Sequence, residues 1–173
     1  MDLNWWHNAK GTMTHNSNEF QDMIVDAGPE AFVVVDFFMP SCHYCVKFMP
    51  EWNRIVDDLT AEYGSDQIKF VKVDGTKDRW TGDRYSIDSY PSFIILQPGT
   101  LGDQFHHWRP KHRDYQGMKH WIKTFAGNRL KPLAAANGAG DAAAKVDHKP
   151  FVLPPPIAAL TNNNNKNGVP ETA

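Results

Sequence analysis

The feature that most constrains this chain is an apolar run that stops at a turn and is followed at once by two cysteines. The run covers residues 31–38, and Asp36 is its single polar residue. A Met-Pro-Ser turn follows, and then Cys42 and Cys45. The β-branched and aromatic content of the run is typical of a strand buried on both faces in the middle of a sheet. Residues 46–59 carry apolar side chains at helical spacing, which predicts a helix behind the cysteines.

The cysteine pair is the only source of thiol chemistry in the chain. Free N–H groups and the helix dipole at the start of a helix favour an anion, which predicts a lowered pKa for the Cys42 thiol. A thiolate is the attacking species in disulfide exchange. Cys45 lies one helical turn away, near enough to close a disulfide and release a mixed-disulfide partner. The spacing therefore indicates that Cys42 attacks and Cys45 resolves.

Two other interpretations of the pair stay open. Half of a zinc site would need two more ligands, and no second cysteine pair exists to provide them. The histidines that could be recruited are His43, His106, His107 and His112. An inert structural pair is the other interpretation, although such a pair is more typical of a core than of an exposed helix start.

The rest of the chain alternates strand-like and helix-like segments. Apolar residues at period 2 or in short runs predict strands, and apolar residues at period 3.6 predict helices. The expected strands are 12–14, 31–38, 68–73, 92–96 and 104–108. The expected helices are 46–59, 78–85, 114–125 and, before them, one of about ten residues that ends at Ala27. Ser17 or Asn18 is expected to cap the first helix. This order predicts an α/β fold with a mixed central sheet covered by helices on both faces.

Composition excludes several classes of protein. The 173 residues carry a formal net charge of −2, which gives no global attraction to nucleic acid or to an acidic membrane surface. No stretch approaches the roughly 20 apolar residues that a transmembrane helix needs. The first residues lack the pattern of a signal peptide or a transit peptide. Two cysteines cannot make a disulfide scaffold, so stability has to come from packing.

Four motifs follow one another in the order and spacing of a known family. They are residues 36–45, 50–52, 72–74 and 85–93, of sequence DFFMPSCHYC, PEW, KVD and YSIDSYPSF. They resemble the thioredoxin superfamily and are most similar to the catalytic domains of protein disulfide isomerases. The resemblance implies a thioredoxin-like domain over residues 12–127.

The resemblance implies roles for several residues. Asp36 matches a buried acid beneath the cysteine pair that helps proton transfer at the resolving cysteine, and Lys72 matches a lysine near that acid. Pro91 matches a cis-proline that faces the pair and lets a substrate strand lie beside it, next to Tyr90. A lone aspartate in so apolar a strand costs free energy without a partner or a role. That cost favours the same interpretation of Asp36 over an aspartate that reaches water at a strand end.

The chain departs from the family pattern around the cysteines. Ser41 stands where the family usually has tryptophan, and it could cap the helix instead. His43 and Tyr44 stand between the cysteines, where they would face a substrate and set the redox potential. An arginine after the last strand tunes the resolving cysteine in the isomerases. Arg113 takes that place when the last helix is matched by its apolar face, and Met118 takes it in the other register.

Two segments lie outside the resemblance. Residues 1–11 form an N-terminal arm. Residues 128–173 are rich in Ala, Pro and Asn without periodicity, which predicts a tail that is disordered on its own. Short apolar islands at 151–154 and 157–160 leave open a second role for the tail, as a strap that orders on a partner.

The segment 105–113, FHHWRPKHR, is basic and aromatic. Such a segment could bind nucleic acid or a metal ion. A strand followed by a solvated loop is the favoured interpretation, because the rest of the chain lacks a basic face.

We therefore expect a thiol–disulfide oxidoreductase that acts on protein thiols or disulfides, with no bound cofactor, metal or nucleic acid. The alternative is a thioredoxin-fold accessory subunit of a large assembly, such as a dynein or a mitochondrial membrane complex, in which the cysteine pair is structural or redox-sensing. The family resemblance suggests the endoplasmic reticulum as the compartment, with the cytoplasm and the mitochondrion as alternatives.

Overall fold

The computed structural model describes residues 4–133, and the predicted strap segments of the tail lie outside the described residues. The described chain forms five strands and four α-helices in the expected order. The strands are β1 (Thr12–Thr14), β2 (Phe32–Phe38), β3 (Ile68–Asp74), β4 (Ser92–Leu96) and β5 (Phe105–Trp108). The helices are α1 (Ser17–Ala27), α2 (His43–Tyr63), α3 (Arg79–Arg84) and α4 (Tyr115–Ala126), with short 3₁₀ turns η1 (Trp5–Asn8) and η2 (Gly127–Arg129).

The five strands form one mixed sheet in the order β1-β3-β2-β4-β5. The central strand β2 pairs in parallel with β3 and in antiparallel with β4. All seven residues of β2 are buried, as the continuous apolar run predicts. The expected α/β fold with a mixed sheet is confirmed.

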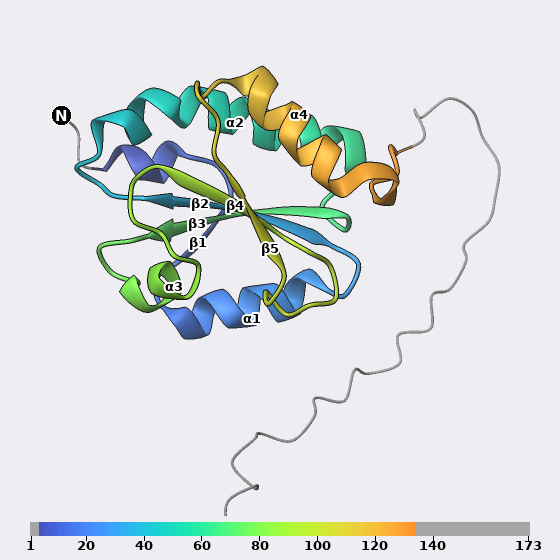
Figure 1. Ribbon diagram of the computed structural model, residues 1–173, viewed down its shortest axis with the longest axis horizontal. Helices are drawn as coiled ribbons and strands as arrows, with labels where there is room; N and C mark the ends of the chain where they lie inside the picture. The colour runs from blue at the N-terminus through green and yellow to red at the C-terminus, as the bar shows by residue number, and fades with distance from the viewer. Residues whose placement is uncertain (1–3, 134–173) are drawn as a thin grey trace, which may run out of the picture. The chain divides into compact units, whose positions relative to one another are not determined.

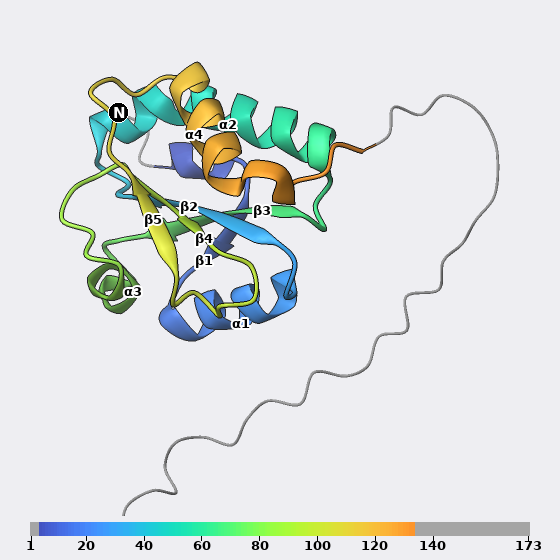
Figure 2. The ribbon, with the colours of Figure 1, turned by 45° about the vertical axis from the view of Figure 1, so that its right-hand side comes forward.

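Helices cover both faces of the sheet (Figures 1 and 2). Helices α2 and α4 lie on one face, and α1 and α3 lie on the other. Alternation along β2 divides its side chains between two apolar clusters, because successive residues of a strand point to opposite faces. Val34 and Phe38 join the cluster beneath α2 and α4, whereas Val35 and Phe37 join the cluster above α1.

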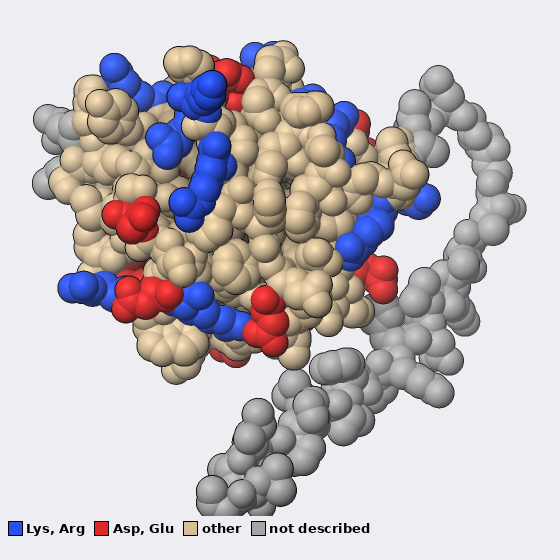
Figure 3. All heavy atoms as spheres, viewed as in Figure 1, with Lys and Arg blue, Asp and Glu red and all other residues tan. Residues whose placement is uncertain are grey.

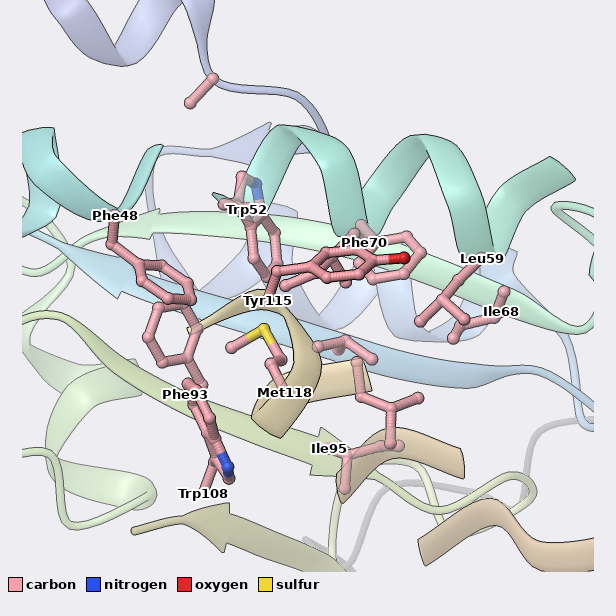
Figure 4. Packing of buried hydrophobic residues seen from close by; sticks show 14 of the residues in the cluster. Phe48, Trp52, Leu59, Ile68, Phe70, Phe93, Ile95, Trp108, Tyr115 and Met118 are labelled. Atoms are coloured by element: carbon pink, nitrogen blue, oxygen red, sulfur yellow. The ribbon is translucent and has the colours of Figure 1, made fainter. Parts of the chain in front are cut away.

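The cluster beneath α2 and α4 is largely aromatic (Figure 4). Trp52 of α2 is fully buried and stacks on Phe93 of β4, with 5.7 Å between ring centroids. Phe48 and Trp108 pack on the same Phe93 ring at 5.0 and 5.7 Å. Aromatic pairs of this kind contribute about 0.5–1.5 kcal/mol beyond their burial. This packing fixes α2, and with it the cysteines at its start, against the centre of the sheet.

Two helix caps differ from the sequence expectation. The N-cap of α1 is Asn16, whose side-chain oxygen accepts hydrogen bonds from the backbone N–H groups of Asn18 and Glu19. Ser17 and Asn18 are therefore wrong as cap predictions. Helix α2 is capped by Cys42 rather than Ser41, and it begins at His43 instead of residue 46.

Both ends of the described chain pack onto the domain. Trp5 is 5% exposed and belongs to the cluster beneath α2. At the other end, Leu130 is buried in the same cluster, and the N–H of Leu133 donates to the carbonyl of Glu62 at 2.8 Å. The packed structure therefore reaches beyond residues 12–127 on both sides. None of the helices described is long and apolar enough to cross a membrane.

Candidate active site around Cys42 and Cys45

The turn that follows strand β2 places Cys42 at the start of α2. The backbone N–H of Cys42 donates to the carbonyl of Met39 at 3.0 Å, which closes the turn after the strand. The Cys42 sulfur then accepts a hydrogen bond from the N–H of Cys45 at 3.1 Å. Cys42 and Cys45 form a disulfide with a Cα–Cα distance of 5.3 Å. The sulfur of Cys42 thus lies where helix N–H groups would stabilise a thiolate after reduction.

The two residues between the cysteines face solvent. His43 is exposed, and the side chain of Tyr44 is 70% exposed. Their rings contact each other edge to face, with 6.0 Å between centroids. Both side chains are therefore accessible to a partner that approaches the disulfide, and their expected role in substrate contact stays a prediction.

Asp36 lies on the sheet face that carries the cysteines. It stands between Val34 and Phe38, which point into the cluster that also contains Cys42 and Cys45, so alternation directs its carboxyl group the same way. Asp36 is 6% exposed, and its Oδ1 has no hydrogen-bond partner among the residues described. Burial raises the pKa of Asp36 to about 7, against the opposing pull of the Lys72 charge.

Lys72 is the direct neighbour of Asp36 across the β2–β3 ladder. It is 4% exposed, and burial lowers its pKa whereas the Asp36 charge raises it. The structure thus brings together the acid and the lysine that the sequence motifs paired. An unpaired carboxylate and an ammonium this deep would each cost several kcal/mol, and their proximity offsets part of that cost.

The N-terminal turn η1 and the residue that follows it supply the hydrogen-bond acceptors for Lys72, which the sequence does not predict. The Lys72 ammonium donates to the carbonyl of Trp6 at 3.0 Å and also to the carbonyl of Ala9. The indole N–H of Trp5 donates to the carbonyl of Pro40 at 2.9 Å, within the turn that precedes Cys42. The one sequence signal of this docking was the Trp5-Trp6 pair in an otherwise polar start.

The Tyr90-Pro91 peptide bond is cis, as the sequence resemblance implies. Ser92 pairs with Phe37, so Pro91 lies beside the carboxyl end of β2, from which the turn to Cys42 departs. Tyr90 packs over Gly75, where an added Cβ would overlap the tyrosine hydroxyl. Partial burial raises the pKa of Tyr90. Pro91 and the cysteine pair are thus at the same edge of the sheet.

Arg113 is exposed in the loop between β5 and α4. It lines a shallow pocket with Ser92 and Asp88, and no hydrogen bond or ion pair joins it to Asp36 in the described structure. Its expected influence on the resolving cysteine stays a prediction. Within residues 4–133 no three His, Cys, Asp or Glu side chains gather in a way that could hold a metal ion.

Comparison with known proteins shows which family and which solved structures this chain resembles. A family model described as Thioredoxin matches residues 11–122. Probable protein disulfide-isomerase A4 of Caenorhabditis elegans is 30% identical over 103 residues, which are 60% of this chain and 16% of that protein. Protein disulfide-isomerase A2 of Homo sapiens is 28% identical over 107 residues, 60% of this chain and 20% of that protein. The chain therefore spans only a small part of the length of these relatives.

Solved structures of single domains show the same fold. The first thioredoxin domain of mouse protein disulfide-isomerase A4 has a TM-score of 0.56 at 20% identity, covering 74% of this chain and 84% of that domain. Thioredoxin of Fasciola hepatica has a TM-score of 0.54 at 17% identity, covering 65% of this chain and 97% of that protein.

The matched residues 11–122 make up more than half of the chain and include the whole sheet, the disulfide and the cis-proline. Fold, site geometry and family match agree on one conclusion. The chain belongs to the thioredoxin family.

Proposed function

We propose that this protein exchanges its Cys42–Cys45 disulfide with thiols and disulfides of protein substrates. The observation that carries the proposal is the disulfide at the start of α2, on the same sheet face as the buried carboxyl group of Asp36. The relatives named as protein disulfide isomerases support it.

The exchange needs no reactant besides the two sulfur pairs. In the reducing direction, the Cys42 thiolate attacks one sulfur of a substrate disulfide, forming a mixed disulfide and releasing the other substrate sulfur as a thiolate. The Cys45 thiolate then attacks the Cys42 sulfur, which breaks the mixed disulfide. The second substrate thiolate leaves and takes up a proton, and the Cys42–Cys45 disulfide closes. Two electrons have passed to the substrate, and the oxidising direction is the same sequence reversed.

Asp36 is proposed to accept the proton that Cys45 loses before it attacks. A base works best when its pKa lies near the working pH, and burial raises the pKa of Asp36 to about 7. Lys72 is proposed to stabilise the carboxylate when the proton has left. A substrate strand is proposed to lie beside Pro91, with the exposed His43 and Tyr44 flanking the sulfur under attack.

Insulin reduction with a dithiol as the regenerating reductant tests the proposal. Cys42→Ser should abolish turnover. Cys45→Ser should retain the first attack and accumulate a mixed disulfide, visible as a mass increase that a reductant removes. Ser41→Ala is the control, since Ser41 does not cap the helix. Wild-type turnover no faster than that of Cys42→Ser would exclude the proposed activity.

A second candidate function is favoured by residues 128–173, which are rich in Ala, Pro and Asn and lie outside the family match. They are proposed to anchor a thioredoxin-fold subunit in a larger protein assembly. Tagged full-length protein should then purify from its own cells with stoichiometric partners that are lost when the chain ends at Leu133. Recovery of the same partners with both lengths would argue against this role for the tail.

A further inference from the structure

The basic loop after β5 contacts neither cysteine in the steps proposed above, and only Arg113 carries an expected role there, as a modulator of the resolving cysteine. Arg109, Lys111 and Arg113 lie within five residues of one another and are all exposed. None of them takes part in an ion pair between described residues. Figure 3 shows basic side chains gathered over the segment that follows β5. The chain as a whole has a formal charge of −2, so this cluster opposes the average charge of the molecule.

Two of these cations line a pocket of about 230 Å³ beside the cis-proline. Arg109 and Arg113 line it together with Ser89 and Ser92. Ser89 and Ser92 precede and follow the Tyr90-Pro91 bond in the sequence. The pocket therefore adjoins the place where a substrate strand would lie in the proposed reaction.

The remaining charged groups of the pocket leave it positive. Asp88 is the one carboxylate in the wall, and it accepts a hydrogen bond from the Ser89 hydroxyl at 2.9 Å. Asp114 follows the loop, and its carboxylate accepts from the N–H of Gly117 at the start of α4. Burial, helped by the charge of Arg109, holds the pKa of His107 below its usual range. At neutral pH the positive charge of the pocket thus comes from the two guanidinium groups.

We propose that the pocket between the Pro91 segment and the loop 109–113 binds an acidic side chain of the substrate, so that the protein prefers cysteines flanked by Asp or Glu. The inference rests on the proposed exchange function for its setting. Arginine recognises a carboxylate through two parallel hydrogen bonds, and the serine hydroxyls can take part. Exposed ion pairs are individually weak, so two arginines should give a preference of roughly three- to ten-fold.

Matched peptide disulfides test the preference. Two fluorogenic peptides differ only in carrying Glu or Lys at the residues that flank the cysteines, and kcat/KM for their reduction by the full chain is compared. The Glu peptide should react about five-fold faster at low salt, and the difference should shrink at 0.5 M NaCl, where the Debye length falls to a few ångströms. Equal rates for the two peptides would overturn the proposal.

Arginine variants locate the preference. Arg109→Gln with Arg113→Gln should reduce the ratio of the two kcat/KM values to about one, because the comparison is made between two peptides on the same variant. Lys69→Gln with Lys131→Gln removes the same charge from sites outside the pocket and should leave the ratio unchanged. If both double variants lose the preference for the Glu peptide, the preference comes from the net charge of the protein, and the proposed pocket is wrong.

A binding measurement separates this inference from the exchange activity. A labelled Glu peptide with serine in place of cysteine is titrated with the oxidised protein by fluorescence anisotropy. It should bind several-fold more tightly than its Lys counterpart, and the arginine double variant should lose that difference. Selective binding would support the acidic-residue pocket even if no peptide is reduced. Insulin reduction without selective binding would support the exchange activity and contradict the pocket. Tighter binding of a single-stranded oligonucleotide than of the Glu peptide at the same arginines would also overturn the proposal that the pocket binds an acidic protein side chain.

Discussion

Asp36 shows how a single residue departs from its usual chemistry because of its place in the sheet. Its strand is buried on both sides, and one carboxyl oxygen has no partner in the described structure. The ordinary pKa of 3.8 rises to about 7 through burial, with Lys72 opposing the rise. The folded protein therefore holds the Asp36 proton more tightly than the unfolded chain does between these two values. Its stability falls as the pH rises through this window, because the unfolded chain ionises first.

Asp36→Asn should remove this pH dependence. The amide cannot ionise, so the variant does not lose this stability as the pH rises. The free energy of unfolding of the variant minus that of the wild type should therefore be about 2 kcal/mol larger at pH 7.5 than at pH 5. Urea unfolding of the oxidised proteins at the two pH values measures the difference. A gain that is the same at both values would show that Asp36 keeps an ordinary pKa in the folded state.

Turn η1 is the element that connects the start of the chain to the site. The carbonyls of Trp6 in the turn and of Ala9 directly after it accept from the Lys72 ammonium, and Trp5 donates to the turn before Cys42. Asn53 of α2 fastens the segment further, donating to the carbonyl of Asn8 at 3.0 Å and accepting from the N–H of Lys10 at 2.7 Å. The turn is therefore bound both to the sheet and to α2.

Trp5→Phe should lower the free energy of unfolding by about 1 kcal/mol, the usual worth of a hydrogen bond whose acceptor is left unpaired. The phenyl ring keeps much of the apolar contact, so the loss measures the N–H donor. Trp6→Phe is the matched control, because no hydrogen bond from the Trp6 indole is found in the part of the chain described here. Chemical denaturation compares the two variants, and equal losses would mean that the bond to Pro40 contributes nothing.

The helices and strands themselves were largely predictable from the sequence. The helix caps and the hydrogen bonds between distant segments were less so. Strand β2 and the apolar face of α4 follow from residue pattern, because burial on one or two faces leaves a clear period. Asn16 was missed as a cap because it stands in a run of polar residues, where any of three could accept the helix N–H groups. The carbonyls that hold Lys72 were not predictable, since backbone acceptors leave no trace in side-chain pattern.

At the scale of the whole molecule, the packed domain is longer than the motifs that identify it. The motifs end with residue 93 and the last helix at Ala126, yet Leu130 is buried. Gln67 holds the following segment by two hydrogen bonds to the backbone of Lys131, both 2.7 Å. The apolar pattern of the last helix ends near Gly127 and predicts an earlier end of the domain, because a short apolar contact after it has no period to reveal it.

Truncation tests where the domain ends. A chain that stops at Leu133 should unfold at the same temperature as the full protein. A chain that stops at Gly127 should lose about 2–3 kcal/mol, because it lacks the Leu130 side chain and the bonds to Gln67. Calorimetry of the three lengths measures these differences. Equal stability of the two shortened chains would place the end of the domain at residue 127.

The burial of Lys72 also makes this amine a reporter of local opening. An acylating reagent modifies only an amine that reaches solvent in its free-base form, and the ammonium here is enclosed by the carbonyls of Trp6 and Ala9. Its labelling rate in the native state is then the intrinsic rate multiplied by the fraction of molecules in which η1 has detached. Mass spectrometry of the peptide that carries Lys72 would thus give the free energy of that detachment. Comparison of oxidised with reduced protein would show whether the Cys42–Cys45 disulfide changes how firmly the N-terminal turn is docked.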